Sequence, residues 1–157
     1  MSQAHLHLLL NHFPIAGIII GLVVLSFSML FRNSDIQKTG MWILLFTALT
    51  AIPVFLTGEG AEQILDSIGQ KSEFFISNHE DYGEKAFWMI ELTGLLSLVA
   101  LIQQRSGKDV KTLTRFVLLV SIISAILIVL TANSGGKIRH SEIRTTIESS
   151  KHNELTK

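Results

Sequence analysis

Four long apolar segments constrain this chain most, because their lengths match the thickness of a membrane. The first, residues 13–31, reads FPIAGIIIGLVVLSFSMLF, and no Asp, Glu, Lys or Arg occurs in residues 1–31. Residues 39–58 and 116–136 are also uncharged, and residues 86–104 contain Glu91 as their charged residue. A helix needs about 20 apolar residues to cross a hydrocarbon core roughly 30 Å thick. We therefore expect four transmembrane helices.

The membrane setting also predicts the fold class. Lipid offers no hydrogen-bond partner to the backbone, so each span must satisfy its own N–H and C=O groups as a helix. The sequence predicts an all-α fold, a four-helix transmembrane bundle with spans at about 13–31, 39–58, 84–104 and 114–134. The membrane domain covers residues 1–140, and residues 141–157 form a polar C-terminal tail. In the intervening loop, 59–83, the stretch Ala61–Ile68 has the pattern of a short helix lying on the membrane surface.

Composition excludes several classes of function. The chain has no cysteine, which removes disulfides, thiolate metal ligands and covalent haem attachment. Its formal net charge is +0, and no basic patch with interleaved aromatic residues is present, so we expect no nucleic-acid partner. The first span lacks the positively charged start of a signal peptide, and we expect it to be retained. The lipid bilayer is the expected partner.

Charge in the loops predicts the orientation. With four spans, the two short loops share one side of the membrane, and both termini share the other side with the loop 59–83. The short loops hold six cationic residues, namely Arg32, Lys38, Arg105, Lys108, Lys111 and Arg115. Cytoplasmic loops carry an excess of Lys and Arg, so we expect both termini outside the cytoplasm, in a bacterial inner membrane. The cationic C-terminal tail is the observation that opposes this orientation.

Five of the six histidines fall at the same end of the predicted bundle. One group precedes the first span, one histidine precedes the third span and one follows the fourth: His5, His7, His12, His79 and His140. This grouping holds in either orientation. His5 and His12 are seven residues apart and share a helical face, whereas His7 points elsewhere and is expected to lie outside their site. Pro14 is expected to start or kink the helix. We therefore expect His12, His79 and His140 to be the main ligands, with His5 next.

Haem b is the expected cofactor of these histidines, and electron transfer the expected function. Haem b takes one or two axial histidines from facing helices, and Lys137 and Arg139 are placed to pair with its propionates. Two alternatives remain open. One is a metal-binding protein or metal-dependent enzyme that holds zinc, copper or iron with His5, His12, His79 and His140 and a nearby carboxylate. The other is a structural subunit of a larger complex or a homo-oligomer, in which the histidines only form hydrogen bonds.

Glu91 is a separate candidate, because an ionisable residue inside a span is costly and usually has a functional role. Its position below the histidines predicts a proton-transfer role or a quinol site. The alternative is a carboxyl group that is hydrogen-bonded to Thr93, to Thr57 or to a backbone carbonyl.

Several segments together resemble a known family. These are His5 to Ile15 with its His-Phe-Pro element, Thr57-Gly58, His79, and Ser134 to His140 with its Gly-Gly pair. The chain resembles a family of small four-helix bacterial membrane proteins, catalogued mainly as uncharacterised, whose histidine before His-Phe-Pro matches either His5 or His7. The chain departs from that pattern in having Ser141 after the last histidine and a longer loop before His79. Some relatives are joined to Rieske or cytochrome-like modules, which implies electron transfer with quinol or a periplasmic redox protein.

Overall fold

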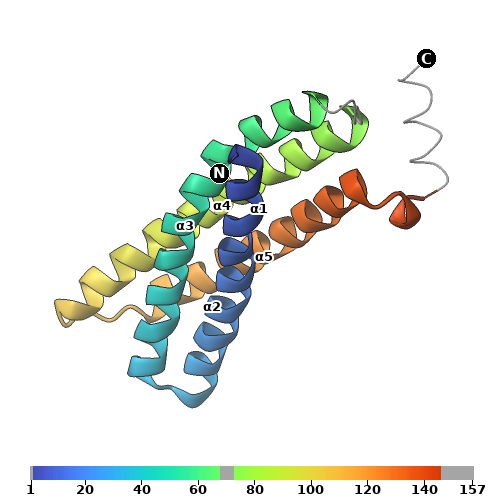
Figure 1. Ribbon diagram of the computed structural model, residues 1–157. Helices are drawn as coiled ribbons and strands as arrows, with labels where there is room; N and C mark the ends of the chain where they lie inside the picture. The colour runs from blue at the N-terminus through green and yellow to red at the C-terminus, as the bar shows by residue number, and fades with distance from the viewer. Residues whose placement is uncertain (1, 68–72, 146–157) are drawn as a thin grey trace.

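The computed structural model describes residues 2–67 and 73–145, and this part of the chain is built from helices (Figure 1). The elements are α1 (Gln3–Leu10), α2 (His12–Phe31), α3 (Ser34–Ser67), α4 (Glu73–Arg105), α5 (Lys111–Arg139) and the short 3-10 helix η1 (Ser141–Ile143). Four stretches are long and apolar enough to cross a membrane: Gln3–Phe31, Ser34–Ala61, Glu73–Arg105 and Lys111–Ile138. The predicted all-α, four-helix bundle is confirmed.

The helices extend beyond the predicted spans on one side of the bundle. α3 continues to Ser67 and α4 begins at Glu73, so most of the expected loop 59–83 is helical. The short surface helix expected at 61–68 is therefore the end of α3, and Ile68 lies outside the described residues. Polar residues continue a helix as readily as apolar ones once packing against a neighbour supports it, and hydropathy therefore underestimates the helix lengths.

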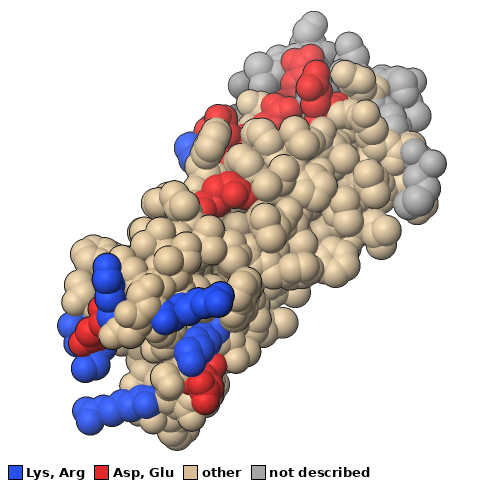
Figure 2. Space-filling view, turned by 90° about the vertical axis from the view of Figure 1, so that its left-hand side faces the viewer, with Lys and Arg blue, Asp and Glu red and all other residues tan. Residues whose placement is uncertain are grey.

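The bundle has two distinct ends. The turn end carries the α2–α3 and α4–α5 connections, and the histidine end carries the start of α1, the end of α3, the start of α4 and the end of α5 (Figure 1). Figure 2 shows Lys and Arg gathered at one end of the molecule, with most of the visible Asp and Glu toward the other. The cationic end is the turn end, because Arg32, Lys38, Arg105, Lys108 and Lys111 lie at these connections. This charge separation is the basis of the predicted orientation, which stays a prediction.

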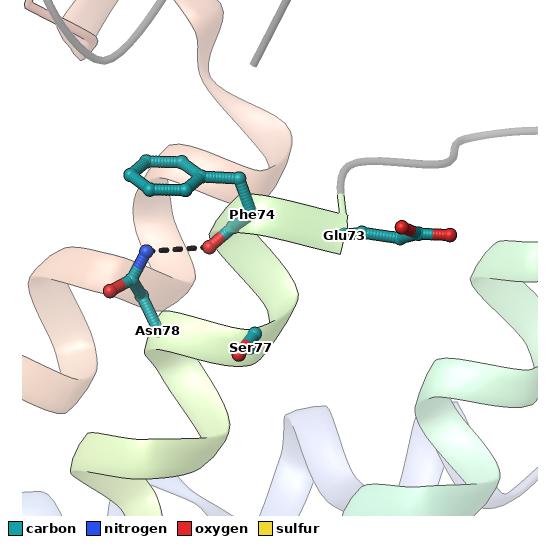
Figure 3. A pocket seen from close by; sticks show the side chains of 4 residues that line it. All are labelled: Glu73, Phe74, Ser77 and Asn78. Carbon is teal, nitrogen blue, oxygen red and sulfur yellow. Dashed lines mark hydrogen bonds between the residues drawn. The ribbon is translucent and has the colours of Figure 1, made fainter. Parts of the chain in front are cut away.

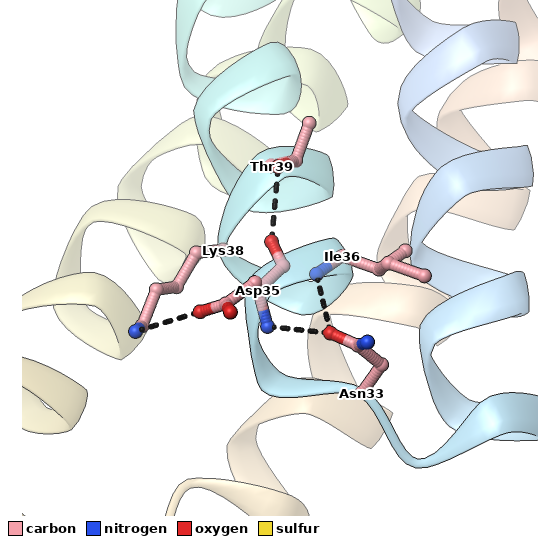
Figure 4. Close-up of polar contacts among 5 residues, drawn as sticks. All are labelled: Asn33, Asp35, Ile36, Lys38 and Thr39. Carbon is pink, nitrogen blue, oxygen red and sulfur yellow. Dashed lines mark hydrogen bonds and ion pairs between the residues drawn. The ribbon is translucent and has the colours of Figure 1, made fainter.

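Local hydrogen bonds explain the tight α2–α3 turn. Arg32 has a left-handed backbone (φ 50°) that ends α2, and Asn33 then caps α3. The Asn33 Oδ1 atom accepts hydrogen bonds from the backbone N–H groups of Asp35 (2.9 Å) and Ile36 (3.1 Å) (Figure 4). An Asn in this position satisfies donors that have no partner within the helix. The chain thus reverses in two residues, and α2 and α3 pack side by side along their lengths.

Small residues bring the helices close together. A side chain on Gly17 would collide with Thr47, one on Gly21 with Leu44 and one on Gly94 with Ala48. These glycines therefore serve helix packing. Small residues are typical of membrane helix interfaces, where van der Waals packing replaces the hydrophobic effect.

The α4–α5 interface contains buried hydroxyl groups. Thr93, Ser97, Ser121 and Ser124 are almost completely buried, and the Thr93 and Ser124 hydroxyls are hydrogen-bonded to each other at 3.0 Å. Each of these four hydroxyls also lies within hydrogen-bond distance of a backbone carbonyl in its own helix. Since a hydroxyl has one proton, either Thr93 or Ser124 donates to the other hydroxyl and the second donates to its own carbonyl. The interface is polar and fully satisfied, and the large apolar side chains of the bundle instead cover much of its outer surface.

Candidate functional site

His7 lies against α3 at the histidine end. Its Nδ1 atom is 3.0 Å from the backbone oxygen of Val54 and 3.4 Å from the Thr57 hydroxyl. A Cβ atom on Gly58 would lie 3.8 Å from the His7 Cε1 atom, so the ring also borders this glycine. The sequence analysis set His7 aside, and the structure shows it packed into the bundle instead.

His79 lies against α5 in the same way. Its Nδ1 atom is 3.0 Å from the backbone oxygen of Thr131 and 3.4 Å from the Ser134 hydroxyl. A Cβ atom on Gly135 would lie 2.9 Å from the His79 Cε1 atom and 3.0 Å from Nδ1. The ring is half-buried, and it fits because residue 135 has no side chain.

The two histidines occupy matching seats. In each seat a backbone carbonyl accepts a hydrogen bond from the histidine Nδ1 atom. The residue three positions after that carbonyl places its hydroxyl beside the same ring, and the next residue in the sequence is a glycine. The hydroxyls also donate to those same carbonyls, at 3.0 Å from Thr57 and 2.9 Å from Ser134. We call these two sets the twin seats: Val54, Thr57 and Gly58 for His7, and Thr131, Ser134 and Gly135 for His79. The first seat lies on α3 and holds His7 from α1, and the second lies on α5 and holds His79 from α4.

The seats fix the proton on each ring. A backbone carbonyl only accepts hydrogen bonds, so the Nδ1 atom must carry the proton that is donated to it. In the neutral ring the other nitrogen, Nε2, then has the free lone pair. Histidines that bind metals usually donate their second N–H in this way, and the bond holds the ring in position. In His7 and His79, Nε2 is thus the nitrogen with the free lone pair.

His7 and His79 both lie at the histidine end, near enough for a charge on one ring to act on the other. Among the described residues, no group of three or more His, Asp or Glu side chains is arranged to hold a metal ion. The structure therefore brings together a pair of imidazoles rather than the predicted trio of His12, His79 and His140.

The other predicted ligands lie on the surface. The exposed His12 ring bonds through Nδ1 to the Leu8 oxygen in the preceding turn (3.0 Å), and His5 is also exposed. The His140 Nδ1 atom is 2.9 Å from Glu142 Oε1. The pKa of Glu142 is lowered, first by its own backbone N–H and then by the hydrogen bond to His140.

The segment after α5 folds back beside the His79 seat. Arg144 donates from Nε to the Lys137 oxygen (2.8 Å) and from Nη2 to the Ile138 oxygen (3.1 Å). Its guanidinium lies 4.3 Å from the centre of the Phe75 ring on α4. Of the two predicted propionate partners, Lys137 is half-buried, and the side chain of Arg139 lies outside the described part of the structure.

A pocket at the start of α4 is a poor candidate for a cofactor. It is lined by Glu73, Phe74, Ser77 and Asn78, which come from consecutive turns of one helix (Figure 3). The Asn78 amide turns back to donate to the Phe74 oxygen at 2.6 Å, so this side chain is already used. The lining contains no imidazole, and the twin seats remain the stronger site.

Glu91 lies deeper in the bundle than the twin seats. It follows His79 by about 18 Å along α4 at 1.5 Å per residue. The Thr93 hydroxyl bonds to Met89 and Ser124, and the Thr57 hydroxyl to Pro53 and Val54. The Glu91 Oε1 atom is covered and has no hydrogen-bond partner among the described residues. The partners that the sequence suggested for Glu91 are thus engaged elsewhere.

Comparison with known proteins identifies the family. A family model described as "Predicted membrane protein (DUF2231)" matches residues 3–144, which is nearly all of the described chain. The chain belongs to this family. Comparisons with curated proteins and with solved structures found no match. Membership of this family agrees with the four apolar helices, and both support a location in the membrane.

The buried face of α2 explains the position of His7 in this DUF2231 chain. The buried residues of α2 are Pro14, Ile18, Gly21, Leu25 and Ser28, and they follow a spacing of three and four. Residues seven apart share a helical face, so this buried stripe, extended backwards from Pro14, reaches His7. His5 and His12 fall off the stripe, which explains their exposure.

Proposed function

We propose that this DUF2231 protein is a membrane haem b protein that takes part in electron transfer, in which His7 and His79 would hold the haem. The twin seats carry the proposal. Each seat holds an imidazole whose Nδ1–H group donates to a backbone carbonyl, which leaves the Nε2 lone pair for a ligand bond. The two rings come from different hairpins at one end of the bundle. A pair of imidazoles from facing helices is the usual ligand set of haem b in helical bundles.

Two glycines and a lysine lie around the twin seats. Gly58 and Gly135 border the two rings without adding side-chain bulk, and Lys137 follows two residues after Gly135, where its ammonium group would pair with a propionate. Haem b would supply a one-electron redox centre. The protein's own part is to hold both rings by their Nδ1–H bonds, which fixes ring orientation and increases ligand basicity.

Two observations favour this function over the alternatives. A mononuclear metal site needs three or four protein ligands, whereas the described residues offer a pair of imidazoles. A purely structural role does not require two matched seats that leave Nε2 free in both rings. Within the proposed function, His12, His140 and His5 are surface residues near the site rather than ligands.

Spectra of the purified protein test this proposal. We expect a Soret band and split reduced α and β bands, both lost in His7→Ala and in His79→Ala. His5→Ala is the matched control, because it removes an exposed imidazole from the same end, and it should keep the full haem content. Full haem content in either His7→Ala or His79→Ala would refute the ligand pair. Colourless protein with a stoichiometric metal would favour a metal site, and colourless protein without metal a structural role.

A further inference from the structure

Glu91 is a polar group in an apolar setting. It lies about 21 Å from Arg105 along α4, well inside a hydrocarbon core that is roughly 30 Å thick. The Glu91 side chain as a whole is half-buried, whereas its Oε1 atom is covered and lacks a hydrogen-bond partner among the described residues. An unsatisfied polar atom in hydrocarbon costs several kcal/mol. A ligand cannot reach the covered Oε1 atom, but the other carboxyl oxygen is not covered, and it can bond to a molecule that supplies a hydrogen-bond partner.

The position of Glu91 follows from the register of α3 and α4. The antiparallel helices place Gly94 against Ala48 and stack Phe87 on Phe55. Between these two contacts, the same register puts Glu91 level with Ala51. The methyl group of Ala51 offers neither a donor nor an acceptor, so the carboxyl lies at an apolar seam between the two helices.

Aromatic rings lie one turn away, toward the histidine end. The Phe55 and Phe87 rings stack with their centres 4.2 Å apart, and Trp88 meets Phe87 edge to face at 5.2 Å. Phe55 is 44% exposed and Trp88 is 61% exposed. Phe87 precedes Glu91 by four residues and therefore shares its face of the helix. We call Phe55, Phe87 and Trp88 the aromatic shelf.

We propose that Glu91 and the aromatic shelf bind the head group of a lipid-soluble quinol or its quinone. Such a molecule reaches the seam through the hydrocarbon. Its flat ring packs against the exposed aromatic side chains. The uncovered carboxyl oxygen of Glu91 accepts a hydrogen bond from a quinol hydroxyl, whereas the protonated carboxyl donates one to a quinone carbonyl. Quinol or quinone would then be the substrate of the proposed electron-transfer function, and in this respect the inference rests on that function. Binding itself requires no haem.

A second copy of the chain fits this seam less well. An isologous contact brings the same patch from both copies. The exposed α4 residues around Glu91 are mostly apolar, namely Trp88, Leu92, Leu95 and Leu98. Apart from the carboxyl itself, that patch offers few groups that can bond to the uncovered oxygen of Glu91, whereas a quinol hydroxyl does so directly.

Tryptophan fluorescence gives a local reporter of binding. The chain contains two tryptophans, and a Trp42→Phe background leaves Trp88 on the aromatic shelf as the remaining one. Titration of the full chain in lipid nanodiscs with decylubiquinone should quench Trp88 saturably, and decylubiquinol should compete. A Trp88→Phe variant keeps Trp42 at the turn end and reports quenching by quinone that is merely dissolved in the lipid.

Two variants then separate specific from general effects. Glu91→Leu keeps the span apolar and should weaken the saturable Trp88 quenching at least tenfold, whereas Glu84→Gln, an exposed glutamate on the same helix, should leave it unchanged. Equal affinity in Glu91→Leu and the parent would overturn the proposal. The proposal would also be overturned if the parent did not bind quinone and the Glu91→Leu substitution converted the protein from a dimer to a monomer. Since quenching is measured with and without haem, loss of the haem proposal would not affect this result.

Discussion

Replacement of Gly135 by alanine tests the geometry of the His79 seat. The added Cβ atom would lie 2.9 Å from Cε1 and 3.0 Å from Nδ1 of the His79 ring, which is closer than real Cβ contacts allow. The ring must therefore move, and we expect this movement to lengthen its 3.0 Å bond to the Thr131 oxygen. Loss of that bond costs roughly 0.5–1.5 kcal/mol, and overpacking typically adds about 1–3 kcal/mol. We expect Gly135→Ala to destabilise the protein by about 2 kcal/mol.

The first seat supplies a matched control. In Gly58→Ala the added Cβ atom would lie 3.8 Å from the His7 Cε1 atom, an ordinary van der Waals distance. We expect this variant to be within about 0.5 kcal/mol of the parent, as surface-like substitutions usually are. The same chemical change at two equivalent positions should thus have different effects.

Two measurements compare the Gly135→Ala and Gly58→Ala variants. Equilibrium unfolding in mixed detergent micelles gives the free-energy difference, and ¹⁵N NMR of histidine-labelled protein reports whether the His79 Nδ1 atom still carries its proton. Gly135→Ala should change both, and Gly58→Ala neither. If Gly135→Ala were as stable as Gly58→Ala with an unchanged His79 signal, the close fit of ring and glycine would be refuted.

Three further predictions concern polar contacts elsewhere. A double-mutant cycle of Thr93→Val and Ser124→Ala should give a coupling energy of roughly 0.6 kcal/mol, typical of hydrogen bonds between membrane helices; a zero coupling would mean that the 3.0 Å contact contributes nothing. Arg144→Ala should accelerate amide exchange in the last turn of α5, because two carbonyls lose their side-chain donor; unchanged exchange would argue against that cap. The carboxyl of Glu142 has a lowered pKa, so its contacts stabilise the segment above the ordinary glutamate pKa and are lost as pH falls through the folded value; ¹³C NMR titration should show a midpoint that rises in His140→Ala.

Much of the architecture was predictable because membrane helices follow from composition. The uncharged runs determined the number of helices, and their number alone put five histidines at one end. The lengths were harder to predict. Hydropathy detects the apolar part of a helix, so the polar extensions of α3 to Ser67 and of α4 from Glu73 were read as a loop. Of the Gly-Gly pair in the sequence, Gly135 borders the His79 ring, whereas Gly136 lies beside Ile143.

The choice of histidines required the folded bundle. By itself the sequence determined that His5 and His12 share one face and that His7 points to another, because helical geometry fixes those angles. It did not determine which face points inward, since the first helix is apolar all round and gives no preferred side. Only the packing of α1 on α3 and of α4 on α5 decided this. That packing brought His7 to the Val54 oxygen and His79 to the Thr131 oxygen, while His5, His12 and His140 stayed on the surface.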